Sequence, residues 1–269
     1  MTNHSLATIA PGKHHAVIGM LHLPALPGAP LARASLDEIT RLMVADAKAL
    51  TEGGVDALMM ENFGDVPFYP GRVPAHVVAM MTAIAVEIRR ASPLPLGINV
   101  LRNDGLSALA IAAACGASFI RVNVLSGARV TDQGVIQGIA HDLLRLRSEL
   151  CATSIKIMAD VDVKHSAALA PRSITDEVED TVKRGLADGV IVSGAGTGKA
   201  VDPSKLQSVA KSAGHAPVIL GSGVSAANIK SLMPHAWGFI VGTSLKQNGD
   251  VSKPVDVARV RELMAAVRG

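Results

Sequence analysis

Short apolar runs alternate with longer amphipathic segments eight times along the chain, and this alternation limits the possible folds more than any other feature. The runs have the length and flanking glycines of buried strands, and the longer segments have the spacing of helices that cover a sheet. The predicted strands are 16–23, 57–63, 96–101, 119–124, 156–163, 189–193, 217–221 and 238–242. The predicted helices are 35–52, 74–90, 104–115, 134–150, 174–186, 203–212, 226–232 and 255–267.

Eight strand–helix units in 269 residues predict an α/β fold of the closed (β/α)8 type, the TIM barrel. Such barrels commonly take about 250 residues as one domain. We therefore expect a single domain over 1–269, with the barrel core at about 16–245 and a C-terminal helix at about 255–267. The alternative is a doubly wound open sheet, which usually has a glycine-rich dinucleotide-binding turn after its first strand. Here the first strand runs into HLPALPG instead.

Composition narrows the functional classes. Hydrophobic residues make up 49% of the chain and charged residues 18%, which excludes a disordered protein. The net charge is only +3, and aromatic residues make up 2%, which argues against a nucleic-acid-binding surface. Two cysteines, Cys115 and Cys151, form no disulfide or zinc motif and favour a reducing compartment. Without a signal peptide or an apolar run of about 20 residues, we expect a cytoplasmic protein with no membrane span.

Polar side chains recur near the carboxyl ends of the predicted strands, on the face that would line the barrel. In 156–163, Ile157, Ala159 and Val161 share one face, whereas Asp160 and Asp162 lie on the other. Enzymes with this fold have their active sites at this end, so we predict a site there. The alternative is a salt-bridge lattice that closes the barrel mouth. The predicted substrate-binding residues are Asn99, Arg102, Asn103, Arg121, Asn123, His165 and Ser193.

The densest group of reactive side chains follows the fifth predicted strand, in Asp160-Val-Asp162-Val-Lys164-His165. A lysine flanked by carboxylates can act as a general acid or base, or as a Schiff-base nucleophile. Alternatively, the two carboxylates and Glu61 can hold a divalent cation. We predict no cofactor, and a bound divalent cation is the alternative. His22 and His165 each fit a catalytic or a structural role equally well. The predicted catalytic residues are His22, Glu61, Asp160, Asp162 and Lys164.

Glycine-rich loops follow the last three predicted strands, at 193–198, 221–223 and 242–244. Glycine lets backbone amides approach an anion closely, and the loops after strands seven and eight of TIM barrels often bind phosphate. The alternative is that these glycines only form tight turns. The predicted phosphate-binding residues are Gly194, Gly221, Ser222, Gly223, Gly242 and Thr243.

The longest irregular stretch, 62–74, follows the second predicted strand and contains three of the six aromatic residues, Phe63, Phe68 and Tyr69. A long loop in a compact domain is often a lid or a binding loop. Alternatively, this loop is a proline-rich surface segment or forms a contact between subunits. The second case would make the protein a homo-oligomer.

Six segments are together distinctive: IGMLHLPALPG, MMENFGDVPF, GINVLRNDGLSALAIA, FIRVNVLSGARVTDQG, ADVDVKH and VSGAGTGKAVD. On these segments the chain resembles the BtpA/SgcQ family from Ile18 to about Thr243. The resemblance implies a TIM barrel. One branch of that family is named for a role in photosystem I biogenesis, and another occurs among sugar-utilisation proteins. The resemblance implies no particular set of catalytic residues.

These features together favour an enzyme acting on a small phosphorylated substrate, either a sugar or a nucleoside-derived metabolite. Lyase, isomerase or epimerase chemistry is favoured over redox chemistry, because no dinucleotide-binding turn is present. The alternative is a non-catalytic biogenesis or stability factor for a membrane complex such as photosystem I. The convergence of Glu61, Arg121 and Lys164 at one end of the barrel favours the enzyme.

Overall fold

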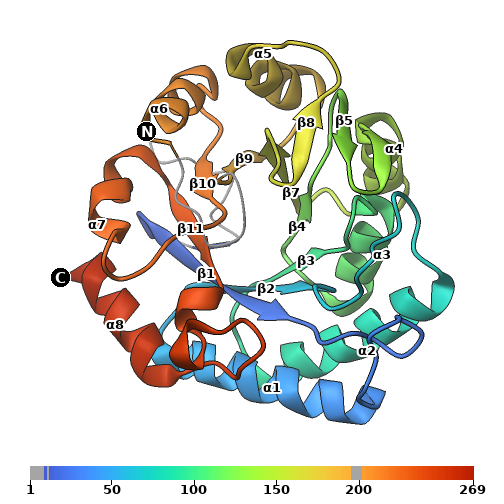
Figure 1. Ribbon diagram of the computed structural model, residues 1–269, viewed down its shortest axis with the longest axis vertical. Coiled ribbons are helices and arrows are strands. Elements are labelled where there is room, and N and C mark those ends of the chain that lie inside the picture. Colours follow the sequence, from blue (N-terminus) through green and yellow to red (C-terminus); the bar gives the residue numbers. More distant parts are fainter. Residues whose placement is uncertain (1–8, 11, 195–201) are drawn as a thin grey trace.

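Eight parallel strands close into a barrel in the computed structural model, which describes residues 9–10, 12–194 and 202–269 (Figure 1). Around the barrel the strand order is β1-β11-β10-β9-β7-β4-β3-β2, and β1 pairs with both β11 and β2. The predicted (β/α)8 barrel is confirmed, and the open-sheet alternative is wrong. The barrel strands are β1 (Ala16–His22), β2 (Ala57–Glu61), β3 (Leu96–Asn99), β4 (Phe119–Val122), β7 (Lys156–Val161), β9 (Gly189–Val192), β10 (Val218–Leu220) and β11 (Gly238–Val241).

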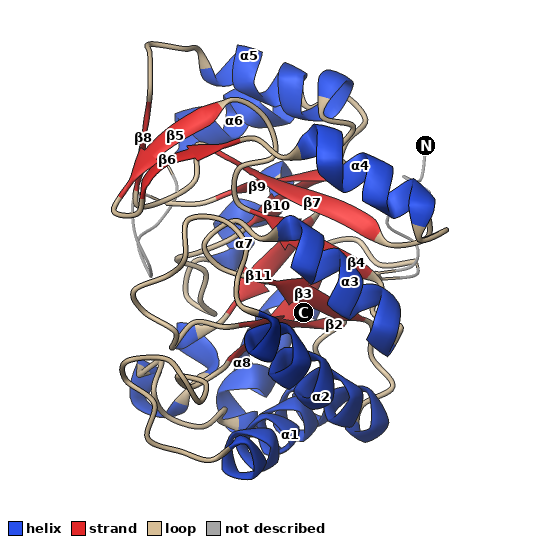
Figure 2. Cartoon of the chain, turned by 90° about the vertical axis from the view of Figure 1, so that its right-hand side faces the viewer, coloured by secondary structure: helices blue, strands red, loops and turns tan. Residues whose placement is uncertain are grey.

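Helices surround the barrel on its outside (Figures 1 and 2). Local sequence sets where they begin: Ser35 and Glu38 form the predicted capping box at the start of α1, and Asp202 caps α6 ahead of Pro203. A π-helical segment, Asp180–Arg184, continues α5. The helices are α1 (Leu36–Gly53), α2 (Ala75–Ala91), α3 (Gly105–Cys115), α4 (Ala140–Glu149), α5 (Ile174–Glu179), α6 (Pro203–Ser212), α7 (Ile229–Leu232) and α8 (Val257–Arg268).

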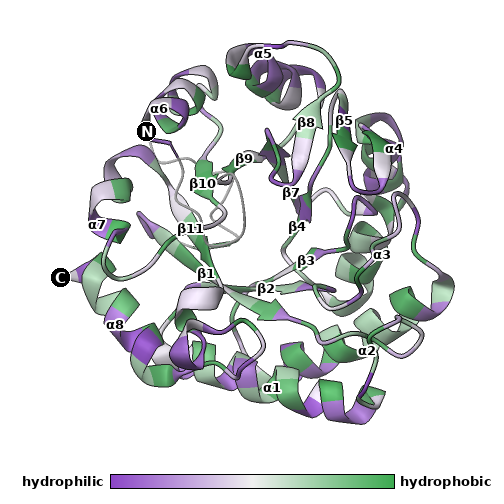
Figure 3. Ribbon diagram, in the orientation of Figure 1, coloured by the Kyte–Doolittle hydropathy of each residue, from purple (hydrophilic) through white to green (hydrophobic). Residues whose placement is uncertain are grey.

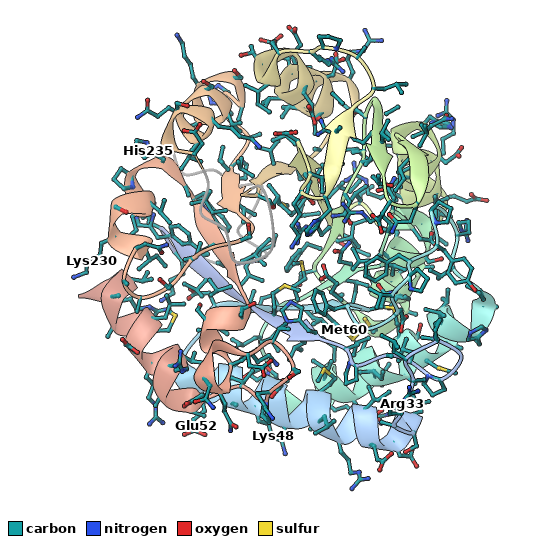
Figure 4. The ribbon with its side chains drawn as sticks, viewed as in Figure 1. Arg33, Lys48, Glu52, Met60, Lys230 and His235 are labelled. Carbon is teal, nitrogen blue, oxygen red and sulfur yellow. The ribbon has the colours of Figure 1, made fainter. Side chains whose placement is uncertain are left out.

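Alternation along the strands produces two apolar layers. Met60, labelled in Figure 4, belongs to the large layer between the barrel and its helices. Met59 belongs to a smaller cluster inside the barrel. The outer helices alternate hydrophobic and hydrophilic residues, as expected where one side of a helix packs on the barrel (Figure 3). Phe119 and Met158 help to fill that interior, and Gly97 leaves room for the Phe119 ring. A Cβ atom on Gly97 would lie 2.2 Å from this ring. The barrel is therefore packed below its mouth, and the buried polar side chains of Asn99, Arg121 and Asp160 lie at its carboxyl end.

A second, antiparallel sheet was not predicted: β5 (Ala128–Thr131), β6 (Gly134–Gln137) and β8 (Ser166–Ala168) pair in the order β6-β5-β8. These strands follow the carboxyl ends of β4 and β7, so the sheet extends the barrel wall on that side (Figure 2). The predicted helix 134–150 is wrong over its first six residues, because β-branched residues flank a turn in which Gly134 has φ +96°. The fifth predicted strand ends early, at Val161, because Asp162 has φ +48°.

None of the helices in the described part of the chain combines the length and the apolar character needed to cross a membrane.

Candidate functional site

Arg121 on β4 and Asp160 on β7 form a buried pair at the carboxyl end of the barrel. Arg121 Nε donates to Asp160 Oδ2 and Nη2 donates to Oδ1, both at 2.8 Å. Asn123 Nδ2 donates to Oδ2 at 3.2 Å, and Ser193 Oγ donates to Oδ1 at 3.4 Å. Four donors thus hold one carboxylate in a salt-bridge lattice. This lattice does not close the mouth, as the alternative prediction required, because a cavity stays open beside it.

Arg121 keeps its positive charge in this lattice. Burial alone would lower the pKa of Arg121, but the Asp160 carboxylate, with that of Glu61, holds this pKa above its ordinary value. Glu61 Oε2 lies 3.9 Å from Arg121 Nη1. Asn99 Nδ2 donates to the Arg121 carbonyl oxygen at 3.1 Å, whereas its buried Oδ1 accepts no hydrogen bond from the described residues. The lattice is therefore satisfied except for one acceptor on Asn99.

Beside this lattice lies a cavity of about 450 Å³. It brings together the predicted catalytic residues His22, Glu61 and Lys164 with the predicted glycine loops after β10 and β11. Arg121 is the one lattice donor in contact with it among the described residues. The cavity-lining residues are Met20, His22, Glu61, Arg121, Lys164, Gly221, Ser222, Gly223, Val224, Ser225, Asn228, Ile240, Val241, Gly242, Thr243, Ser244, Gly249 and Arg259.

The loops after β10 and β11 are held in place by their own side chains. Asn228 accepts a hydrogen bond from the Ser225 amide at 2.9 Å and donates to the Gly223 carbonyl at 2.7 Å. Gly223 has φ +71°, a conformation that favours glycine. Ser244 Oγ donates to the Val224 carbonyl at 2.8 Å and so ties the two loops together. This wall of the cavity is therefore preformed.

Sequence reasoning missed Arg259, which belongs to α8 and lines the same cavity. Its Nη1 lies 3.4 Å from the Ser244 carbonyl oxygen, so a guanidinium stands beside the glycine loops. We refer to Gly221–Gly223, Gly242–Ser244 and Arg259 as the cradle. In the sequence, Arg259 is only one basic residue of the terminal helix. Nothing local links it to the glycine loops, because α8 reaches them only when the barrel closes and α8 packs against α1.

Gly194 was predicted to bind phosphate, but its amide donates to Ser222 Oγ at 3.0 Å and it does not line the cavity. Gly196 and Gly198 of the same predicted loop lie outside the described residues.

Lys164 follows β7 and lines the cavity. Burial lowers the pKa of its amine, and Arg121 adds to this effect, while Glu61 and Asp160 oppose it. Arg102 is buried and donates to the Lys164 carbonyl oxygen at 2.6 Å, so it holds the backbone that carries the amine. Arg102 was predicted to bind substrate. In the structure it contacts the Lys164 backbone and does not line the cavity.

His22 closes β1 at the same end. Burial, reinforced by Lys246 and Lys164, lowers the pKa of its imidazole to about 3, so the ring is neutral at physiological pH. A Cβ on Gly242 would lie 2.5 Å from His22 Cε1, so glycine at this position makes room for the ring. The ring centroids of His22 and Phe63 are 4.8 Å apart, which places the aromatic 62–74 loop against the site.

Asp162 lies away from the cavity. Its Oδ1 accepts from Arg129 Nη2 at 2.5 Å and its Oδ2 from Lys205 Nζ at 2.6 Å, while Glu177 joins the network through Arg129. The chain turns after Val161, so the two-residue alternation that paired Asp162 with Asp160 no longer holds. Glu61, Asp160 and Asp162 are therefore not brought together. Among the described residues no group of three or more His, Cys, Asp or Glu side chains is placed to hold a metal ion.

Two further predicted substrate-binding residues lie outside the cavity lining. Asn103 is buried and clamps Val124, donating to its carbonyl at 3.0 Å and accepting from its amide at 2.8 Å. His165 is exposed and has φ +57°.

The closed eight-stranded barrel with a polar cavity at its carboxyl end defines a TIM-barrel protein. The sequence model of the BtpA family matches residues 13–269, and the chain belongs to that family.

Relatives in this family come from distant organisms. An uncharacterized protein of Thermococcus kodakarensis is 49% identical over 92% of this chain and 93% of its own length. The photosystem I biogenesis protein BtpA of Synechocystis is 44% identical over 94% of this chain and 88% of its own length.

Solved structures share the fold at low sequence identity. N-(5'-phosphoribosyl)anthranilate isomerase from Pyrococcus furiosus has a TM-score of 0.59 at 16% identity, covering 95% of this chain and 99% of that one. KGPDC from Streptococcus mutans has a TM-score of 0.60 at 11% identity, covering 95% and 98%. A native KDPGal structure has a TM-score of 0.58 at 12% identity, covering 94% of each chain.

Proposed function

We propose that the protein is an enzyme that acts on a phosphorylated sugar or nucleoside-derived metabolite, by lyase, isomerase or epimerase chemistry. The observation that carries this proposal is one cavity that joins the cradle to the side chains of Lys164, Glu61 and His22. One end of that cavity offers amides and a guanidinium, and the other offers groups that transfer protons.

The cradle suits a phosphate monoester. Gly221, Gly223 and Gly242 let backbone approach an anion, and Arg259 supplies a permanent positive charge for its oxygens. Loops after the last two strands are the common phosphate site of TIM barrels. The neighbour from Pyrococcus furiosus is named for a phosphoribosyl substrate, which supports the same class of ligand here.

The chemistry would centre on Lys164. Its lowered pKa increases the fraction of neutral amine, which can take a proton from a carbon next to a carbonyl or attack that carbonyl. Arg121 stays charged because of Asp160 and can stabilise negative charge that develops on the substrate. Glu61 is a second proton carrier beside Arg121, and the neutral His22 ring can hydrogen-bond a substrate oxygen.

A thermal-shift screen against phosphorylated sugars and nucleotides, with and without Mg²⁺ or Zn²⁺, tests the proposal. A ligand at 100 times its dissociation constant adds about 2.7 kcal/mol to the free energy of unfolding. We expect phosphorylated sugars to raise the melting temperature and their dephosphorylated forms to leave it unchanged. Equal shifts from both forms, or no shift with any phosphorylated compound, would contradict the proposal.

A second candidate function is a biogenesis or stability factor for a membrane complex. It is favoured by the name of the Synechocystis relative, which is 44% identical. An assembly factor acts through its outer surface, and Val130, Val135 and Leu169 expose apolar side chains on and next to the antiparallel sheet. Substitutions inside the barrel mouth separate the two candidates, as described below.

A further inference from the structure

A second cavity of about 380 Å³ lies beside the first, between α1, the loop after β2 and the loop that follows β11. We call it the side cavity. Leu42 in its lining is 48% exposed. Its apolar wall is formed by Leu23, Pro24, Leu42, Met43, Phe63 and Val251.

The buried charged groups of the side cavity already satisfy each other. Lys246 Nζ donates to Asp46 Oδ2 at 2.5 Å, and Asp46 Oδ1 accepts from the Val255 amide at 2.8 Å. Both side chains are buried, so this pair is a fixed part of the wall and needs no ligand to complete it. What the cavity offers a ligand is therefore mainly apolar surface.

His22 is the link between the two cavities, because it lines both. One side of its environment is the cradle at Gly242, and the other is the Phe63 ring. Its imidazole is neutral, and Nδ1 is buried without a hydrogen-bond partner among the described residues. A neutral ring can pack against an apolar neighbour without removing a charge from water, and its Nδ1 can form a hydrogen bond with a polar atom of the ligand.

We propose that the ligand of this protein is a phosphate monoester that also carries an apolar ring. Its phosphate lies in the cradle, and its ring passes His22 into the side cavity between Phe63 and Met43. The phosphate half of this inference rests on the proposed function. The ring half rests on the side cavity, its satisfied ion pair and the shared His22 wall.

Calorimetric titration with inorganic phosphate and a series of phenylalkyl monophosphates of increasing linker length tests the inference. We expect one range of linker lengths to bind about tenfold more tightly than inorganic phosphate or more, because the ring then leaves water for the side cavity. Shorter members should bind like inorganic phosphate, since their ring stops short of His22.

Ala45→Phe places a bulky side chain in the side cavity from an exposed position on α1. Lys48→Phe is the matched control, because Lys48 is exposed on the same helix and does not line the cavity (Figure 4). The gain in affinity should persist in Lys48→Phe and disappear in Ala45→Phe, while inorganic phosphate binds all three proteins equally.

Two results would overturn the inference and leave the cradle standing: equal affinity for phosphate and every phenylalkyl phosphate, or a gain that survives in Ala45→Phe. Failure of every compound, inorganic phosphate included, to bind the native protein would overturn the inference and the proposed function together.

Discussion

The two halves of the barrel mouth differ in what their strands carry at the carboxyl end. On the side of β3, β4 and β7, large polar side chains meet, and Arg121, Asp160 and Asn123 satisfy one another. On the side of β10 and β11, the equivalent places are taken by Gly221 and Gly242, and the mouth stays open as a cavity. Large complementary side chains thus fill one half of the mouth, and glycines leave an open cavity in the other.

Three side chains lie at the border between these halves, next to the lattice and in the lining of the cavity: Lys164, Glu61 and His22. The polar residues at the mouth therefore differ in what they contact. Asp160, Asn123 and Ser193 hold partners in the lattice and do not line the cavity, whereas Arg121 and the three border residues do. The comparison therefore predicts that substitutions in the two halves will have different consequences.

The largest effect is expected at the border, for Lys164→Met. If its amine transfers the proton, the rate falls by about 10³-fold, within the range typical of a lost general acid or base, while the melting temperature changes little. Turnover of a ligand found in the screen measures this directly. Complementation of a deletion strain by Lys164→Met and Glu61→Gln is the parallel test. Full rescue by both folded variants would favour the assembly factor over the enzyme.

In the closed half, Asp160→Asn should reduce the free energy of unfolding by about 3–5 kcal/mol, because it leaves the buried Arg121 charge without its main partner. Asp162→Asn is the matched control: that carboxylate is 43% exposed, and its ion pairs contribute about 1 kcal/mol or less. Denaturant titrations of both variants measure the difference. Equal losses would show that Asp160 is not the anchor of the lattice.

In the open half, Arg259→Met should weaken phosphate binding by about tenfold to a hundredfold and leave stability almost unchanged, because a charge-assisted hydrogen bond contributes about 1.5–3 kcal/mol. Calorimetric titration with phosphate measures the loss. Arg261→Met provides the control, because Arg261 lies on the exposed side of the same helix and pairs with Glu52 of α1. A similar loss in both variants would indicate general electrostatic attraction and no specific contact at the cradle.

The effect that is smallest at neutral pH concerns His22, because its contribution to stability changes only as the pH falls. The pKa of His22 is lowered from 6.5 to about 3 in the folded protein, so the unfolded chain binds one more proton between these values. Stability conferred by the neutral ring is complete above pH 6.5 and is lost as pH falls toward 3. His22→Gln should therefore show a shallower loss of unfolding free energy over this window. Parallel pH profiles for the two proteins would contradict the burial of this ring.

Much of this architecture follows from the sequence. Each predicted strand contains an observed barrel strand, because buried parallel strands read as short apolar runs whatever their neighbours are. Within the strands, period-two alternation correctly placed Glu61, Arg121 and Asp160 at the mouth. That rule stops where a strand stops, which is why Asp162 points instead to Arg129 and Lys205.

The features that the sequence did not predict depend on contacts between segments distant in sequence. Arg259 reaches the cradle only because α8 packs back on the barrel, and the β6-β5-β8 sheet forms only because β8 returns to pair with β5. Local pattern favoured a helix through 134–139, but β6 pairs instead with the adjacent β5 in a hairpin that turns at Gly134. The third strand, β8, then joins β5 from 37 residues away, as in the Arg129–Ser166 contact. The side cavity likewise unites three segments that no motif connects.

A crystal structure with a bound phosphorylated sugar tests the central claim most directly, namely that the open half of the mouth holds a phosphate beside Lys164. We predict the phosphate oxygens within hydrogen-bonding distance of the amides of Gly223 and Thr243 and of the Arg259 guanidinium, with the sugar carbons directed toward the Lys164 amine. A phosphate bound elsewhere on the molecule, or a sugar directed away from Lys164, would contradict it.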